Sequence, residues 1–140
     1  MSVQDIQEEI ISEFSFFGDW MEKYEYIIDL GKNLPIIDVQ YKDEDHLIKG
    51  CQSQVWLQAE LKGDEVQFTA DSDAIITKGI IALLIRVLSG QSPKDIAEAD
   101  LYFIDQIGLR EHLSPTRSNG LLSMVKQMKI YGLALQQVKS

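Results

Sequence analysis

Apolar residues recur at spacings of three and four over residues 3–17, which is the pattern of one face of an amphipathic helix. A second helix is predicted to start at Asp19, because Asp19 followed by Glu22 forms a capping-box pattern. We expect this helix to run through Leu30, with Gly31 as the residue just after its C-terminus. The two helices are predicted to form a hairpin.

The stretch that follows, residues 33–49, shows no sustained helical period. It contains Pro35 and an acidic run at 43–45, so we predict a loop with room for a short strand near 38–41.

Apolar and polar residues then alternate over 55–61 and again over 66–70, and the sequence KGDE between them is typical of a tight turn. Such alternation indicates strands with one buried face. We therefore predict an antiparallel β-hairpin, whose first strand begins shortly after Cys51.

A helix predicted over 74–88 is apolar at almost every position, which means that it is buried nearly all round. The sequence DSDA at 71–74 supplies candidates for its N-cap, Asp73 among them, and Gly90 stops it. Lys78 stands out on this helix, and we expect it to reach the surface or to pair with an acid.

Two short helices and one long helix are predicted after this buried helix. Ser92 and Pro93 suit the first positions of a helix that ends near Ala99, and a second short helix ends near Gly108. The last helix carries a methionine and aromatic stripe that is typical of core packing: Leu121, Met124, Val125, Met128, Tyr131, Leu135 and Val138. Helices, a small antiparallel sheet and further helices, in that order, predict a single α+β domain over residues 1–140.

Charge and composition argue against several classes of function. Asp and Glu number 22 against 13 Lys and Arg, a formal net charge of −9, which argues against binding to nucleic acid. The N-terminus has no basic region followed by an apolar one, and the longest apolar run, at 80–85, is too short to cross a bilayer. We expect a cytoplasmic protein with no membrane association.

The chain has one cysteine and two histidines, so it cannot form an internal disulfide or supply a cysteine-rich metal site by itself. We expect no metal and no cofactor. Common catalytic signatures for nucleotide binding, serine hydrolysis and zinc proteolysis are also absent.

Cys51 has two interpretations, a small buried core residue or a nucleophile presented by a loop. Free cysteines are often small buried hydrophobes, but Gly50 permits a tight turn, and Gln52, Ser53 and Gln54 are poor core residues. A loop thiol becomes a nucleophile when its surroundings lower its pKa.

Two alternatives follow from these residues. A hydrolase or transferase would use Cys51 with His46 or His112 as the base. An adaptor that only binds a partner would make no use of the thiol.

Four segments resemble the SufE family of sulfur-acceptor proteins: WMEKYEYIIDLGKNLP at 20–35, GCQSQVW at 50–56, DSDAIITKG at 71–79 and HLSPTRSNGL at 112–121. The likeness runs over about residues 5–138. The GCQS form favours SufE over CsdE, its near relative in the Csd system. The family fold is shared with IscU-type scaffolds, but a scaffold needs several cysteine ligands and this chain has one.

The resemblance implies an accessory sulfur-transfer protein rather than an enzyme. Cys51 would accept persulfide sulfur from a PLP-dependent cysteine desulfurase of the SufS type and stimulate that enzyme. It would then relay the sulfur to a SufB-containing scaffold for iron–sulfur cluster assembly. A homodimer is compatible with the sequence, which fixes no oligomeric state.

The resemblance also assigns supporting residues. Asp73 and Arg117 match functional positions of the family, although Asp73 also suits a helix N-cap and Arg117 a surface cation. We assign Gly50, Gln52 and Ser53 to loop control or partner binding. Our hypothesis is a two-state loop with Gly50 as hinge, in which the thiol packs against Val55, Trp56 and the buried helix when free and extends on docking.

Overall fold

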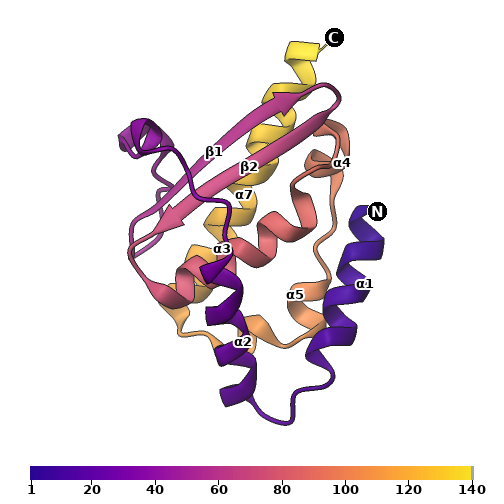
Figure 1. The fold of residues 1–140 in the computed structure, drawn as a ribbon, viewed down its shortest axis with the longest axis vertical. Coiled ribbons are helices and arrows are strands. Elements are labelled where there is room, and N and C mark those ends of the chain that lie inside the picture. Colours follow the sequence, from indigo (N-terminus) through magenta and orange to yellow (C-terminus); the bar gives the residue numbers. More distant parts are fainter. Residues whose placement is uncertain (140) are drawn as a thin grey trace.

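Helix α3 (Ile75–Leu88) runs through the middle of the molecule, and the other elements pack around it (Figure 1). The computed structural model describes residues 1–139, so the predicted domain end at residue 140 lies outside the described residues. In chain order the other elements are α1 (Val3–Phe14), α2 (Trp20–Lys32), η1 (Val39–Tyr41), η2 (Glu44–His46), β1 (Val55–Lys62), β2 (Glu65–Ser72), α4 (Pro93–Glu98), α5 (Phe103–Gln106), α6 (Leu109–His112) and α7 (Pro115–Lys139). The α+β prediction is confirmed.

Helices α1 and α2 run in opposite directions through a short connection, as predicted for a hairpin, but they spread apart like a V and each packs against α3 (Figure 1). They meet only near their connection, where the rings of Phe14 and Phe17 contact Tyr26. Arg86 of α3 pairs with Glu9 and Glu13 of α1, so ion pairs also link α3 to α1.

Gly31 has a different role from the predicted one. Helix α2 continues through it to Lys32. Gly31 lies against Gly79 of α3, and a methyl group on Gly31 would come within 3.0 Å of the Gly79 nitrogen. A methyl group on Gly79 would come within 2.2 Å of the Ile27 carbonyl oxygen. The two glycines therefore let the backbones of α2 and α3 approach closely.

The predicted β-hairpin is present. Strands β1 and β2 pair antiparallel, from Val55 opposite Ser72 to Lys62 opposite Glu65. The alternating apolar residues face α3 and α7, and Val55, Leu57, Val66, Phe68 and Ala70 are all buried. Sequence alternation thus fixed the buried face of the sheet.

No strand forms over 38–41, where the chain instead makes the 3₁₀ helix η1. The Asp38 carboxylate accepts a hydrogen bond from the Gln40 backbone N–H at 3.1 Å, a local bond that competes with strand pairing. On either side of this stretch, isolated bridges join the chain to the sheet, Ile36 to Ala70 and Leu47 to Trp56.

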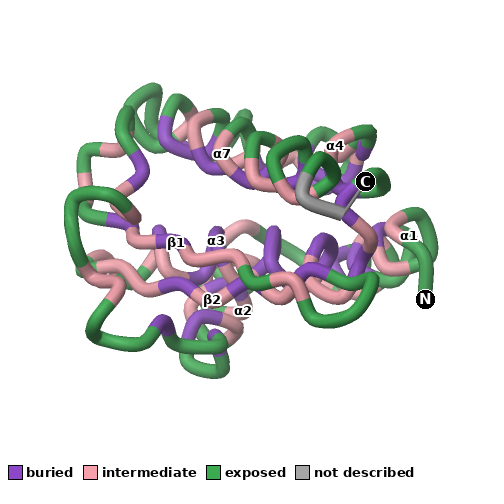
Figure 2. The backbone as a smooth tube through the Cα atoms, turned by 90° about the horizontal axis from the view of Figure 1, so that it is seen from above, coloured by how far each residue is buried: buried purple, intermediate pink, exposed green. Residues whose placement is uncertain are grey.

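The C-terminal helices follow the predicted order, with one addition. Ser92 caps α4, as predicted, by accepting a hydrogen bond from the Asp95 N–H at 3.1 Å. Gly108 takes a left-handed conformation with φ of 75°, which starts the unpredicted short helix α6. In the long helix α7 the buried positions face the rest of the molecule and the exposed ones line its outer side (Figure 2).

The α7 stripe is core, as predicted, at Leu121, Met124 and Met128. The side chain of Val138 lies outside the described residues. No helix among residues 1–139 has the length and apolar character needed to span a membrane.

Replacing Gly79 with alanine tests the close contact between α2 and α3. We expect Gly79→Ala to lower the free energy of unfolding by about 1–3 kcal/mol, because the added methyl group overlaps the Ile27 carbonyl. Urea unfolding followed by circular dichroism measures this. Gly18→Ala is the matched control, since the nearest atom to its methyl group lies 3.9 Å away. Equal stability of the two variants would contradict the packing argument.

Candidate functional site

The loop 49–54 carries Cys51 and connects the segment that contains η1 and η2 to β1. Gly50 enters this loop with φ of 96°, a conformation that favours glycine. A methyl group on Gly50 would also lie 2.4 Å from the Ser123 hydroxyl oxygen of α7. The entry to the loop is therefore pressed against α7 and needs glycine for two separate reasons.

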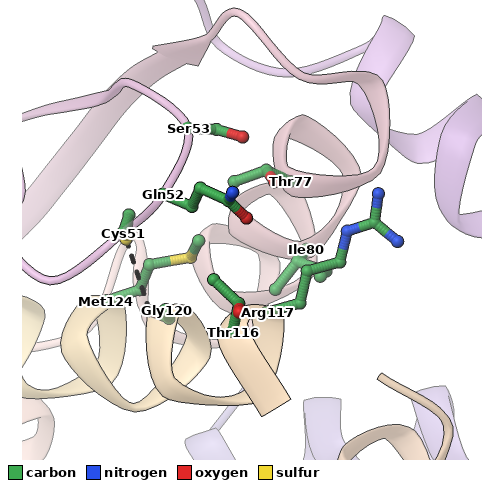
Figure 3. Close-up of a pocket in the computed structure, with 9 residues that line it drawn as sticks. All are labelled: Cys51, Gln52, Ser53, Thr77, Ile80, Thr116, Arg117, Gly120 and Met124. Carbon is green, nitrogen blue, oxygen red and sulfur yellow. Dashed lines mark hydrogen bonds between the residues drawn. The ribbon is translucent and has the colours of Figure 1, made fainter. Parts of the chain in front are cut away.

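The thiol of Cys51 is half-buried and points toward α7 (Figure 3). It donates a weak hydrogen bond to the carbonyl oxygen of Gly120 at 3.6 Å. A methyl group on Gly120 would come within 3.4 Å of the sulfur, so a larger residue at this helix position would press on the thiol. Burial raises the pKa of Cys51, which favours the neutral thiol over the thiolate.

A small pocket of about 70 Å³ lies beside the sulfur (Figure 3). The cysteine loop, α3 and α7 each contribute to its lining: Cys51, Gln52, Ser53, Thr77, Ile80, Thr116, Arg117, Gly120 and Met124. The side-chain amide of Gln52 points toward Thr77, across the mouth of the pocket (Figure 3). Apart from Arg117, the residues that line the pocket are apolar or carry uncharged polar groups.

The pocket includes some of the predicted packing partners of the free thiol and residues that were not predicted. The buried helix α3 does line the pocket, through Thr77 and Ile80, but Val55 and Trp56 do not. Residues from α7 take their place, because the chain folds α7 back alongside β1. Of these α7 residues, the sequence pointed to Arg117 as functional and to Met124 only as a core residue.

Asp73 closes the other end of the cysteine loop. Its carboxylate accepts a hydrogen bond from the Gln54 backbone N–H at 3.0 Å, and its own N–H donates to the Gln54 carbonyl at 3.3 Å. The Ser72 hydroxyl donates to the same carbonyl at 2.8 Å. Asp73 is not the N-cap of α3, since Ala74 holds that place without a side-chain bond. Its carboxylate holds the cysteine loop instead.

Asp71 lies near the end of β2, two residues before Asp73, and pairs with both Lys42 and Lys78. The expectation that Lys78 pairs with an acid is confirmed. Burial raises the pKa of Asp71, but hydrogen bonds from Lys42, the Ser72 backbone and Lys78 outweigh it, so the pKa lies below its usual value. Through its ion pairs with Lys42, which follows η1, and Lys78 of α3, Asp71 links both elements to the β-hairpin.

Arg117 lies on the rim of the pocket in the first turns of α7. Its side chain is exposed and extends away from Cys51, past Ile80 (Figure 3). Within residues 1–139 its guanidinium group has no ion-pair partner, and Asp73 is held by Gln54 instead. The structure thus brings Arg117 to the pocket but not to the sulfur.

Neither histidine lines the pocket of Cys51. His46 is hydrogen-bonded to Asp43 at 2.7 Å, and His112 stacks on Trp20 with its Nδ1 3.0 Å from the Gly108 carbonyl oxygen. A Cys-His pair of the hydrolase type therefore has no base beside the thiol. The described part of the chain also contains no cluster of three or more His, Cys, Asp or Glu residues suited to a metal ion.

Comparison with known proteins gives a consistent result. The family model described as SufE, an Fe–S metabolism associated domain, matches residues 8–131. An uncharacterized SufE-like protein of Rhizobium meliloti is 39% identical over 127 residues, which cover 87% of this chain and 91% of the relative. A SufE-like protein of Arabidopsis thaliana, named as chloroplastic/mitochondrial, is 39% identical over 130 residues, which cover 92% of this chain and 35% of that protein.

A solved structure shares the fold. The solution structure of a hypothetical protein from Thermus thermophilus matches with a TM-score of 0.79 at 19% sequence identity, covering 94% of this chain and 96% of the other. At this identity the match concerns the fold alone.

Removal of the Asp73 carboxylate tests its hold on the loop. We expect Asp73→Ala to raise the alkylation rate of Cys51 at neutral pH by about 3- to 10-fold, since one hydrogen bond is worth about 1 kcal/mol. Because burial raises the pKa of the thiol, the rate of the parent should keep rising with pH above the usual cysteine range, and the variant's profile should move to lower pH.

Iodoacetamide labelling followed by mass spectrometry measures both effects. Asp38→Ala is the matched control, because Asp38 makes a similar local bond, to Gln40, in another loop. A parental rate in Asp73→Ala would show that the carboxylate does not restrain the thiol.

Proposed function

Because this chain belongs to the SufE family, associated with Fe–S metabolism, we propose that Cys51 accepts sulfur from a cysteine desulfurase of the SufS type and delivers it to a SufB-containing scaffold. The donor would be the persulfide that a PLP-dependent desulfurase forms on its own cysteine. In this role the chain is an accessory protein that stimulates the desulfurase and passes through a persulfide of its own.

The single thiol beside a small pocket carries this proposal. The described residues place no histidine in the pocket and offer no metal cluster, so a transferable sulfur atom is the cargo that best suits the site. A pocket of about 70 Å³ has room for one added sulfur atom beside the thiol, since a water molecule needs only about 10–15 Å³ on a similar measure.

The transfer needs no oxidant and no reductant. The Cys51 thiolate attacks the outer sulfur of the donor persulfide, the donor S–S bond breaks, and the donor cysteine leaves as a thiolate. One S–S bond is exchanged for another, and the terminal sulfur keeps its oxidation state. With no second cysteine in the chain, no neighbouring thiol can displace this sulfur and form an internal disulfide.

The buried position of the thiol implies a second loop state. Attack requires a thiolate, but burial against α7 raises the pKa of Cys51 and disfavours that form. We infer that the reactive state has the loop extended into the partner, with Gly50 as the hinge. The pocket state would then shelter the persulfide between transfers.

Asp73 and Arg117 have complementary parts in this scheme. Asp73 would stabilise the pocket state through Gln54, and its release would accompany docking. The guanidinium of Arg117, exposed on the rim, would pair with the thiolate, the persulfide or an acid of the partner once the loop has moved. A reducing compartment, such as the cytoplasm, belongs to the proposal because it keeps Cys51 as a thiol.

Mass spectrometry tests the sulfur transfer directly. Mixed with a SufS-type desulfurase, PLP and free cysteine, the chain should gain the mass of one sulfur atom at Cys51, and cysteine turnover should rise severalfold. Cys51→Ser should gain no mass and should give no stimulation. Stimulation by the serine variant equal to that of the parent would favour the adaptor alternative and defeat the proposal.

Amide hydrogen exchange tests the two-state loop. Addition of the desulfurase to Cys51→Ser, which cannot react, should change exchange at residues 49–54, because the contacts with Ser123 and Gly120 are lost on extension. Exchange in α4, on another part of the molecule, serves as the internal reference. Unchanged exchange in the loop at saturating desulfurase would exclude the extended state.

A further inference from the structure

Three side chains with polar groups are buried in the described part of the chain: Gln7, Thr77 and Gln91. The Gln7 amide donates to the Asp100 carbonyl at 3.0 Å, and the Gln91 amide donates to the Met1 carbonyl at 3.0 Å. The hydroxyl of Thr77 has no hydrogen-bond partner among residues 1–139. Buried polar groups nearly always have a partner, so the position of this hydroxyl needs an explanation.

Thr77 lies in the first turn of α3 and is only 6% exposed. A threonine in a helix commonly bonds to a carbonyl one turn back, and Thr77 makes no such bond. In the described part of the chain, the side-chain N and O atoms that are closed to solvent all have a partner, so the unpaired Thr77 hydroxyl is open to solvent. Thr77 lines the Cys51 pocket, which gives the hydroxyl this access. A buried donor therefore faces the space beside the thiol.

The surroundings of this hydroxyl favour an anion. The N-cap of α3 is Ala74, which makes no side-chain bond to the first turn. The free N–H groups at a helix start carry a partial positive charge, and Thr77 is the third residue of the helix. Among the described residues that line the pocket, none is acidic, and Arg117 adds a cation at the rim. A negatively charged atom in the pocket would thus be stabilised.

Building on the proposed function, we propose that the Thr77 hydroxyl donates a hydrogen bond to the outer sulfur of the Cys51 persulfide and holds this sulfur in the pocket. After transfer the outer sulfur carries a proton, which it loses to solvent more readily than a thiol does. The resulting anion accepts the hydrogen bond from the hydroxyl. The contact itself neither forms nor breaks a covalent bond.

This bond distinguishes the loaded loop from the empty one. In the empty protein the Cys51 thiol donates to the Gly120 carbonyl at 3.6 Å, and the Thr77 hydroxyl has no partner within the described residues. An added sulfur atom gives the hydroxyl an acceptor, so the pocket state of loop 49–54 gains a bond only when the sulfur is present. Thr77 therefore shifts the loop toward the pocket state after loading and leaves the empty loop unchanged.

The other hydroxyls of the pocket do not serve in the same way. Ser53 moves with Cys51 on the same loop, so a bond from it would not tie the loop to the rest of the molecule. Thr116 is exposed, and water competes for its hydroxyl. Thr77 instead belongs to the buried helix α3, and the Gln52 amide points toward it across the mouth of the pocket (Figure 3).

The rate of sulfur loss from loaded protein tests the bond. Sodium polysulfide loads Cys51 without a desulfurase, because the thiolate takes one sulfur and a shorter polysulfide leaves. Dithiothreitol then removes that sulfur as hydrogen sulfide, and mass spectrometry follows the loss. Thr77→Val keeps the branched shape without the hydroxyl and should lose sulfur about 3- to 10-fold faster than the parent. Thr77→Ser keeps the hydroxyl and should stay near the parental rate. A parental rate in Thr77→Val would overturn the proposal.

Two further measurements separate this role from a structural one. The empty thiol of Thr77→Val should react with iodoacetamide at the parental rate within twofold, and an equal rise in alkylation and in sulfur loss would overturn the proposal. The urea midpoint of Thr77→Val should match or exceed that of the parent, because a buried hydroxyl without a partner destabilises the fold. A lower midpoint would reveal a structural partner of the hydroxyl and would also overturn the proposal.

The polysulfide route keeps this inference separate from the proposed function. Faster sulfur loss from Thr77→Val, in a protein that no desulfurase loads, would support the role of Thr77 and defeat the proposed function. Equal sulfur loss from Thr77→Val and the parent, in a protein that the desulfurase does load, would defeat the role of Thr77 and leave the proposed function intact.

Discussion

The burial of most of α3 is the constraint on which the rest of the structure depends. Nine of its residues are buried, so it needs cover from several directions at once. Helices α1 and α2, the hairpin and α7 supply that cover. The close approach of α2 at Gly79 and the ion pairs of Arg86 with α1 fix two of these neighbours in place. The hydrophobic effect thus determines where the functional loop starts and ends.

The cysteine site is a product of this arrangement. The chain enters α3 through Ser72 and Asp73, which hold Gln54, and the first turns of α3 supply Thr77 and Ile80 to the pocket. Helix α7 closes the opposite side at Gly120. A loop held at both ends and free between them can keep a thiol sheltered and still release it. Shelter has a chemical cost, since burial disfavours the thiolate. In the proposed function, docking of the partner offsets that cost.

The small sheet has two different edges. Loops and the 35–37 segment satisfy the outward groups of β2, whereas the later part of β1 keeps its outward groups open. Edges of this kind commonly carry charged residues that limit unwanted pairing, and here Glu60 and Lys62 flank the open part. The described part of the chain therefore covers the two edges of the sheet unequally.

The sequence by itself determined most of the local elements and the candidate reactive thiol. Alternation fixed the hairpin, Ser92 marked the start of α4, and the count of one cysteine pointed to Cys51, because these features depend on near neighbours in the chain. Only the tertiary structure decided that Gly31 packs against α3, that Asp73 holds Gln54 rather than capping α3, and that α7 covers the thiol. These outcomes depend on contacts between residues far apart in sequence, and such contacts exist only after α3 has been buried.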